Sequence, residues 1–220
     1  MRYSANEVEA ALTKAAVAKC YPYGLATDIA AAAVLLSAYG VDGVRGALDA
    51  IVAADFSLPD NAGDAGGTGG ARREVKDTAD KIHLHDCRAA VLGTVAAELA
   101  LATTKTVHCH CVDSPLLLAG FVALAAGRYG VSYQFNVADS CIEIPECCSL
   151  AEVAELSAGS NVLLKISATS ATTPLRTTAG GVEVAAQDWQ IIQMLAAQTY
   201  VAATAESRSQ GAGAGEIDND

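Results

Sequence analysis

The chain has few basic residues and no long apolar run. Its 14 lysines and arginines are outnumbered by 25 aspartates and glutamates, which gives a net charge of −11, and the only basic pair is Arg72-Arg73. Nucleic acids and anionic membranes bind positively charged surfaces, so this balance disfavours both partners. No apolar run reaches the roughly 18 uncharged residues that suggest a membrane span, and the N-terminus lacks the plan of a signal peptide. We therefore expect a cytoplasmic protein.

Cysteine is present, but not in a pattern that fits disulfides or a structural zinc site. The seven cysteines are an odd number, so a disulfide framework would leave one unpaired. Without an export signal, reduced thiols are the default. The Cys-x-x-Cys spacing of structural zinc sites is absent, and Cys147 and Cys148 are adjacent, which suits tetrahedral chelation poorly. The cysteine spacing therefore gives no support to a zinc-finger type of site.

Residues 1–56 carry the signals of an N-terminal helical segment. Ser4 and Glu7 have the spacing of a capping box at a helix N-terminus, and apolar residues then recur at helical spacing. We expect this first helix to end at the turn of residues 21–24. A second helix is predicted over residues 25–39, and a third begins after Asp42 as its N-cap.

Glycine is concentrated in two segments. Residues 61–70 are too rich in glycine for a helix or strand, so residues 57–73 are interpreted as a loop or linker. No G-x-G-x-x-G motif lies between a strand and a helix, and no P-loop lysine follows, so the nucleotide-binding signal is weak. Residues 206–220 form a Gly-rich tail whose composition favours disorder.

Residues 74–205 alternate between strand-like and helix-like patterns. Strands are predicted over residues 81–85, 106–112, 131–137, 141–144 and 161–169, and helices over 87–103, 115–128, 149–156 and 185–204. Asp86 is the predicted N-cap of the helix over 87–103. Such alternation is typical of an α/β fold with a mixed or parallel sheet covered by helices. Together with the N-terminal helical segment, we expect one structural domain.

The four histidines of the chain form two His-x-His pairs, His83 with His85 and His108 with His110. Because side chains alternate between the faces of a strand, both members of a pair point the same way. If the two strands are neighbours joined by the intervening helix, four imidazoles converge. Neutral imidazole is a common ligand of zinc, which activates water when a coordination position stays open. The pattern therefore indicates a possible transition-metal site.

Two alternatives to that metal site stay open. In the first, a one-residue slip in register puts the two histidine pairs on opposite faces of the sheet. Cys109 and Cys111 are expected to share the face opposite to that of His108 and His110, and buried cysteines behave mostly as small hydrophobes. The histidines would then be ordinary strand residues. A further alternative is a cysteine nucleophile, Cys111 or Cys141, at the end of a strand with His108 or His110 near it.

A second candidate site lies at the N-terminal turn. Tyr21 and Tyr23 place two hydroxyls before a helix N-terminus, where backbone N–H groups can receive an anion. Tyr21, Tyr23 and Glu7 are candidate catalytic residues for proton transfer, and Asn6 and Gly24 are candidate ligand-binding residues. The alternative is that this segment simply packs a helix corner.

The tail offers two more candidate ligand-binding residues, Ser207 and Arg208. The guanidinium group of Arg208 can bind a carboxylate or phosphate in a fork geometry, and the glycine N–H groups that follow can assist it. If the tail is ordered, these groups would bind an anion or a neighbouring subunit.

Both ends of the chain resemble an uncharacterised bacterial protein family. Three segments are similar to its N-terminus: Asn6-Glu7-Val8-Glu9, Tyr21-Pro22-Tyr23-Gly24-Leu25-Ala26 and Gly40-Val41-Asp42-Gly43. Three others are similar to its C-terminus: Ser207-Arg208, Gly211-Ala212-Gly213-Ala214-Gly215 and Asp218-Asn219-Asp220. The resemblance covers roughly the first fifty residues and the last fifteen. It transfers no activity and no catalytic residue, but it implies that the two ends act together around one site.

The predicted function is that of an enzyme acting on a small anionic metabolite, with its site at the N-terminal turn and the Ser207-Arg208 tail. The alternative is a non-catalytic metal-binding or accessory protein, in which His83, His85, His108 and His110 hold a transition metal such as zinc. In either case a homo-oligomer is expected.

Overall fold

The computed structural model describes residues 1–53, 75–137, 140–144, 153, 160–167 and 181–199. Within these ranges it contains six helices, a six-stranded sheet and a two-stranded sheet. No helix of the described part is long and apolar enough to cross a membrane. The predicted linker over 57–73 and the tail over 206–220 lie outside the described residues, as does the helix predicted over 149–156 apart from Val153.

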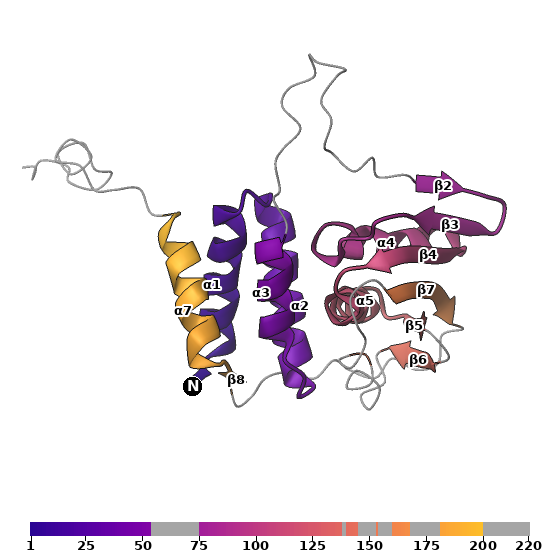
Figure 1. Cartoon of the computed structure of the whole chain (residues 1–220). Coiled ribbons are helices and arrows are strands. Elements are labelled where there is room, and N and C mark those ends of the chain that lie inside the picture. The colour runs from indigo at the N-terminus through magenta and orange to yellow at the C-terminus, as the bar shows by residue number, and fades with distance from the viewer. Residues whose placement is uncertain (54–74, 138–139, 145–152, 154–159, 168–180, 200–220) are drawn as a thin grey trace, which may run out of the picture.

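Four helices form the layer shown on the left of Figure 1: α1 (Ala5–Ala18), α2 (Tyr23–Ala38), α3 (Gly43–Ala53) and α7 (Ala186–Ala197). The predicted capping box of α1 is confirmed, because the Ser4 hydroxyl accepts the Glu7 N–H and the Glu7 carboxylate accepts the Ser4 N–H. The predicted cap of α3 is confirmed too, since the Asp42 carboxylate accepts the Arg45 N–H at 3.1 Å.

Helix α2 begins two residues earlier than predicted. Pro22 is its N-cap, with φ −54°, and Tyr23 and Gly24 therefore form the first helical turn. Proline is tolerated here because the N–H groups at the start of a helix have no intrahelical partner, so its missing N–H costs no hydrogen bond. The Pro22 carbonyl accepts the Ala26 N–H at 2.9 Å. The turn between α1 and α2 is thus shorter than residues 21–24.

A two-stranded sheet ties the N-terminus to α7. Its strands β1 (Arg2–Tyr3) and β8 (Val182–Glu183) are antiparallel, and the Met1 amino group donates to the Val184 carbonyl at 2.8 Å. The Tyr3 ring stacks on Trp189 of α7, with 3.9 Å between ring centroids. Neither strand was predicted, because two residues are too few to show the alternation that marks a strand.

The main sheet is mixed, as predicted, with strand order β2-β3-β4-β7-β5-β6. Its strands are β2 (Val75–Asp77), β3 (Lys81–Leu84), β4 (Thr106–Val112), β5 (Ser132–Val137), β6 (Ser140–Ile144) and β7 (Ser160–Ser167). Only β3 and β4 are parallel, and the four other pairings are antiparallel. Helix α4 (Ala89–Thr103) joins the two parallel strands, and α5 (Pro115–Tyr129) follows β4.

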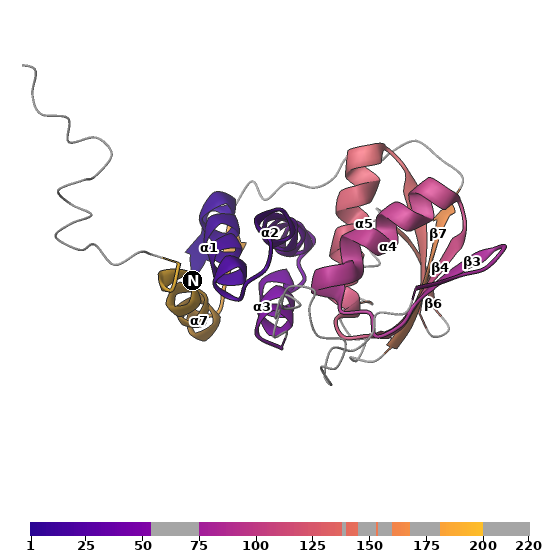
Figure 2. The ribbon, with the colours of Figure 1, turned by 90° about the horizontal axis from the view of Figure 1, so that it is seen from above.

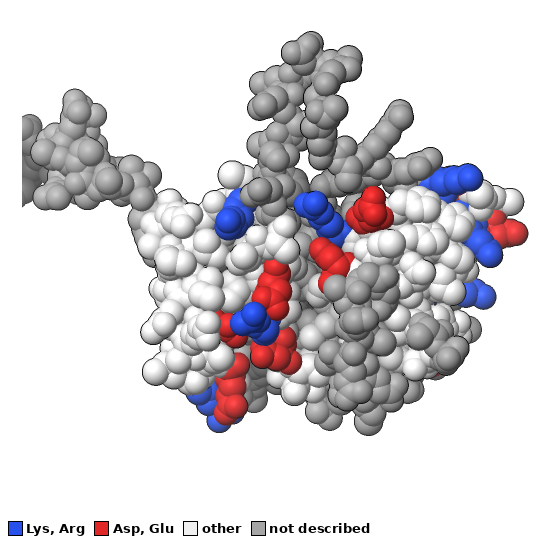
Figure 3. Space-filling view, viewed as in Figure 1, with Lys and Arg blue, Asp and Glu red and all other residues white. Residues whose placement is uncertain are grey.

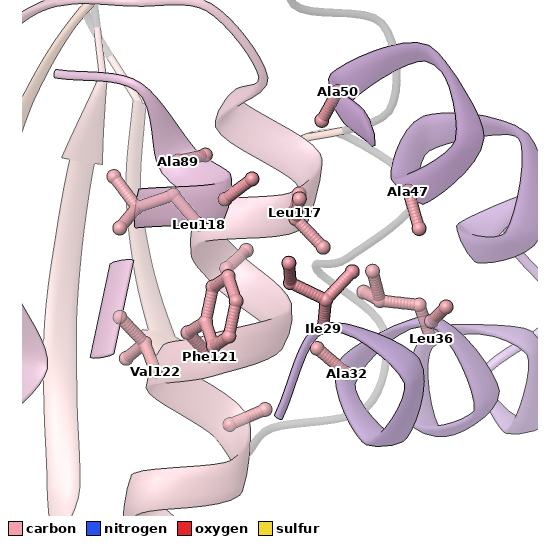
Figure 4. Packing of buried hydrophobic residues seen from close by; sticks show 14 of the residues in the cluster. Ile29, Ala32, Leu36, Ala47, Ala50, Ala89, Leu117, Leu118, Phe121 and Val122 are labelled. Carbon is pink, nitrogen blue, oxygen red and sulfur yellow. The ribbon is translucent and has the colours of Figure 1, made fainter. Parts of the chain in front are cut away.

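Helices α4 and α5 lie between the sheet and the N-terminal helices (Figure 2). On the sheet side they cover a face of buried residues that includes Leu84, Val107 and Phe135. On the other side α5 meets α2, and Figure 4 shows Leu117 and Phe121 directed toward Ile29. The core therefore runs through both helical layers and ends at the helix-covered face of the sheet, which leaves the opposite face for polar residues.

Candidate metal centre

The pairing of β3 with β4 brings all four histidines of the chain to the opposite face of the sheet. His83 and His108 are Cα partners in the parallel register, and each has its His-x-His partner two residues further on, near the carboxyl end of its strand. Leu84 and Cys109, which alternate with the histidines, are buried on the helix-covered face. The predicted convergence of the two pairs is confirmed by this register.

Three of the imidazoles have ring nitrogens within metal-chelating reach. One ligand nitrogen from each of His83, His108 and His110 lies within 4.8 Å of the others, and His83 Nδ1 is 3.0 Å from His110 Nε2. Zn–N bonds of about 2.0–2.1 Å in tetrahedral geometry place ligand nitrogens about 3.3 Å apart. The His85 ring stacks on His110 with 4.6 Å between centroids. Small side-chain rotations would thus complete a three-histidine set.

The surroundings keep two of these imidazoles neutral. The pKa of His108 is lowered from its usual value of 6.5 by partial burial and by the neighbouring His83, Lys81 and His110. The pKa of His110 is lowered by partial burial and by His85 and His83. A lowered pKa leaves the ring deprotonated at pH 7, with a lone pair on one nitrogen. Neutral imidazole is the form that binds metals.

The cysteines near the histidines belong to other environments. Cys87 and Cys109 are buried, and a hydrogen bond with Cys87 together with burial raises the pKa of the Cys109 thiol well above its usual range. Cys111 was expected to share the face of Cys109, and this is wrong: a β-bulge between Cys109 and Val112 gives Cys111 φ +51° and leaves it exposed. Its N–H donates to the Asn161 side chain at 3.1 Å.

The alternative of a cysteine nucleophile placed Cys111 or Cys141 near His108 or His110, and the sheet order contradicts this for Cys141. Cys141 belongs to β6, which is separated from β4 by β7 and β5. Strands lie about 4.8 Å apart, so three steps across the sheet amount to about 14 Å. A histidine-activated nucleophile at Cys141 is therefore excluded by this arrangement.

The end of β4 also organises the start of α4. Asp86 was predicted to cap this helix, but Arg88 is the N-cap residue and supplies no side-chain hydrogen bond. Instead, the Asp113 carboxylate accepts the Ala89 N–H at 2.7 Å. Burial raises the pKa of Asp113, although this and other backbone hydrogen bonds act in the opposite direction. This hydrogen bond connects the end of β4 to the start of α4, at the edge of the sheet where His85 and His110 lie.

The N-terminal candidate residues are only partly brought together. Asn6 and Tyr23 line a groove of about 370 Å³ between α1 and α2, together with Glu9, Ala10, Thr13, Lys14 and Thr27. Glu9 and Lys14 belong to α1 and were missed, since single charged residues on a helix surface carry no sequence signal of a site.

The other N-terminal candidates have different surroundings. Glu7 is engaged in the capping box, and its hydrogen bonds with Ser4 lower its pKa. Tyr21 is buried, and its hydroxyl donates to the Ala50 carbonyl at 3.3 Å, away from the groove. Gly24 lies in the first turn of α2 with open space where a side chain would project. Ser207 and Arg208 lie outside the described residues.

Fold and site together define a mixed α/β protein with a histidine cluster on the sheet face opposite its helices. The model of a family described as "Protein of unknown function (DUF3726)" matches residues 3–55. This match confirms the predicted resemblance of the N-terminal segment to an uncharacterised family. The bacterial origin of that family and the C-terminal part of the resemblance stay predictions.

No curated protein matches the chain. Among solved structures, the crystal structure of malate dehydrogenase from Entamoeba histolytica is similar at 10% sequence identity with a TM-score of 0.44. That match covers 62% of this chain and 38% of the malate dehydrogenase.

Proposed function

We propose that this protein binds a transition-metal ion through His83, His108 and His110. The observation that carries the proposal is the placement of three ring nitrogens within 4.8 Å of one another on two adjacent parallel strands. Strands held in a hydrogen-bonded register provide a rigid base for a ligand set, which favours binding because little order has to be gained. Zinc is the ion we favour, since it accepts imidazole ligands in tetrahedral sites.

The fourth coordination position in this proposal belongs to a non-protein ligand. His85 stacks on His110 and is not among the three histidines whose nitrogens lie close together. Three protein ligands and one open position are the arrangement of catalytic zinc, whereas structural zinc has four protein ligands. The cluster therefore supports a site that can hold water or a small molecule, and through it the predicted enzyme activity.

Elemental analysis of protein purified without a metal-affinity tag tests this proposal. We expect about one zinc or other transition-metal ion per chain, lost in His108→Ala because the site then has two of its three ligands. Cys141→Ser is the matched control, since this exposed thiol lies on β6 and should not affect the metal content. Metal-free protein, or a content unchanged in His108→Ala, would rule the proposal out.

The groove between α1 and α2 supports a second candidate function, the binding of a small anionic metabolite. Its lining combines the Lys14 amine, the Asn6 amide and the Tyr23 hydroxyl, beside the N-terminal turn of α2. Tyr23 is 72% exposed and is free to contact a ligand. This candidate keeps two residues of the predicted N-terminal site.

A titration followed by amide NMR tests the second candidate. Citrate added to the full chain should shift the amide signals of Tyr23 and Gly24 in a saturable way, and Lys14→Met should weaken binding about tenfold. Lys19→Met, at the C-terminal end of the same helix, should leave the affinity unchanged. Equal binding by the Lys14→Met and unsubstituted proteins would exclude the groove.

A further inference from the structure

Three lysines surround the histidine cluster on the same face of the sheet. Lys76 of β2 is the Cα partner of His83, and Lys81 lies two residues before His83 on β3. Lys165 of β7 lies two residues after Leu163, which is the Cα partner of His108. Because side chains alternate along a strand, all three lysines project from the histidine face.

These lysines lie close to the proposed ligands. Lys76 is a Cα partner of His83, at about 5 Å, and Lys81 lies two positions from His83 on one strand, at about 7 Å. Lys165 is diagonal to His108, at about 8 Å. Lys81 is near enough that its charge contributes to lowering the pKa of His108. A flexible four-carbon stem lets each ammonium group reach toward the centre of the cluster.

The three lysines have no ion-pair partner among the described residues. All three are exposed. Within the described part of the chain, the lysine that forms an ion pair is Lys105, whose partner is Asp77. In the space-filling view, several blue side chains lie at the end of the molecule that carries β2 and β3, with a red one beside them (Figure 3). This clustering occurs in a protein whose net charge is −11.

A metal ion in the histidine cluster would add two positive charges among three others. Like charges at these separations repel, and the double charge of the metal doubles its repulsion of each lysine. An oxyanion that coordinates the metal among the lysines reverses the sign of each interaction. The combination of an open coordination position with surrounding ammonium groups therefore selects for a negatively charged fourth ligand.

We propose that the metal held by His83, His108 and His110 takes an oxyanion as its fourth ligand, with Lys76, Lys81 and Lys165 binding the same group. The oxyanion is the phosphate or carboxylate group of a small molecule. This inference rests on the proposed metal site and names the class of molecule that occupies its open position.

Cobalt(II) in place of zinc makes the anion visible by NMR. Visible absorption first shows that Co²⁺ is bound to the full chain. Inorganic phosphate is then added and its ³¹P relaxation recorded, and in a parallel sample ¹³C-labelled acetate is followed by ¹³C relaxation. We expect saturable paramagnetic relaxation of at least one of the two probes, and the one that responds identifies phosphate or carboxylate as the group recognised.

Lysine variants of the cobalt-loaded protein test the second half of the inference. Lys81→Met and Lys165→Met should each raise the anion concentration needed for half-saturation about fivefold, the effect of about 1 kcal/mol. Lys19→Met on α1 is the matched control and should change nothing. Exposed lysines on strands tolerate this substitution, because the methionine retains most of the apolar stem.

The possible failures are distinguishable. If no cobalt spectrum develops, the metal site itself is wrong and this inference falls with it. If cobalt binds but neither probe relaxes, the metal site stands and the oxyanion ligand is excluded. If a probe relaxes equally in both lysine variants and in the unsubstituted protein, the lysines have no part in binding and the inference is overturned.

Discussion

At the scale of single residues, Asp113 links the end of β4 to the start of α4. Its carboxylate accepts the Ala89 N–H, while burial raises its pKa. A carboxyl group whose pKa is higher in the folded than in the unfolded state destabilises the fold when it ionises. This cost is absent below the unfolded-state pKa, grows as the pH rises, and is complete above the folded-state pKa.

Asp113→Asn should therefore stabilise the protein at neutral pH. The amide oxygen still accepts the Ala89 N–H, and the side chain cannot ionise. We expect a higher urea midpoint than that of the unsubstituted protein at pH 7, and similar midpoints near about pH 3, where Asp113 is protonated. Urea unfolding at both pH values checks this.

Asp42→Asn is the control for the Asp113 variant. The Asp42 side chain also accepts a backbone N–H, that of Arg45, but Asp42 is exposed. Its replacement should not reproduce the gain at pH 7, because no burial cost is removed. A gain at both sites, or at neither, would contradict the account given for Asp113.

These caps show how far sequence reasoning reaches at the residue scale. Ser4 with Glu7, and Asp42, were predicted correctly, because a cap and its helix are close in sequence. The cap of α4 was assigned to Asp86 and comes instead from Asp113, 24 residues away along the chain. Only the adjacency of β3 and β4 reveals that partner, and no local pattern encodes it.

At the scale of elements, α4 and α5 pack closely through Gly93. A Cβ atom added at Gly93 would overlap the ring of Phe121, which is 2% exposed. Gly93→Ala should therefore destabilise the protein by about 1–3 kcal/mol, although alanine has the higher helix propensity. Denaturant unfolding monitored by circular dichroism measures the change.

Gly46→Ala in α3 is the matched control for this packing. A Cβ atom there would meet Leu116 Cδ2 at 3.8 Å, an ordinary van der Waals contact. With no clash to offset it, the gain in helix propensity should stabilise the protein by about 0.5–1 kcal/mol. Stabilisation by both substitutions would show that α4 and α5 are not packed as described.

Element identity was largely predictable, and element pairing was not. The strand over residues 106–112 was predicted with its observed bounds, because Val107 and Cys109 alternate with the histidines. The placement of β7 between β4 and β5 depends on contacts distant in sequence. The bulge that exposes Cys111 was equally hidden, since it is a local change in pairing with β7.

At the scale of the whole molecule, the two candidate sites lie in different layers. The family match covers α1 to α3, which contain the groove lined by Asn6 and Tyr23. The histidine cluster lies beyond α4 and α5, on the far face of the sheet (Figure 2). The sequence suggested both candidate sites, but the register of β3 and β4 was needed to favour the histidines.

The central claim is that three of the four histidines bind one metal ion. Ring-¹⁵N NMR of histidine-labelled protein titrated with Zn²⁺ tests it most directly, since the chain has only four histidines to assign. We predict metal-bound shifts for His83, His108 and His110, complete at one equivalent, with a smaller change for His85. Ring signals that stay unchanged, or that drift without saturating at one equivalent, would contradict the claim.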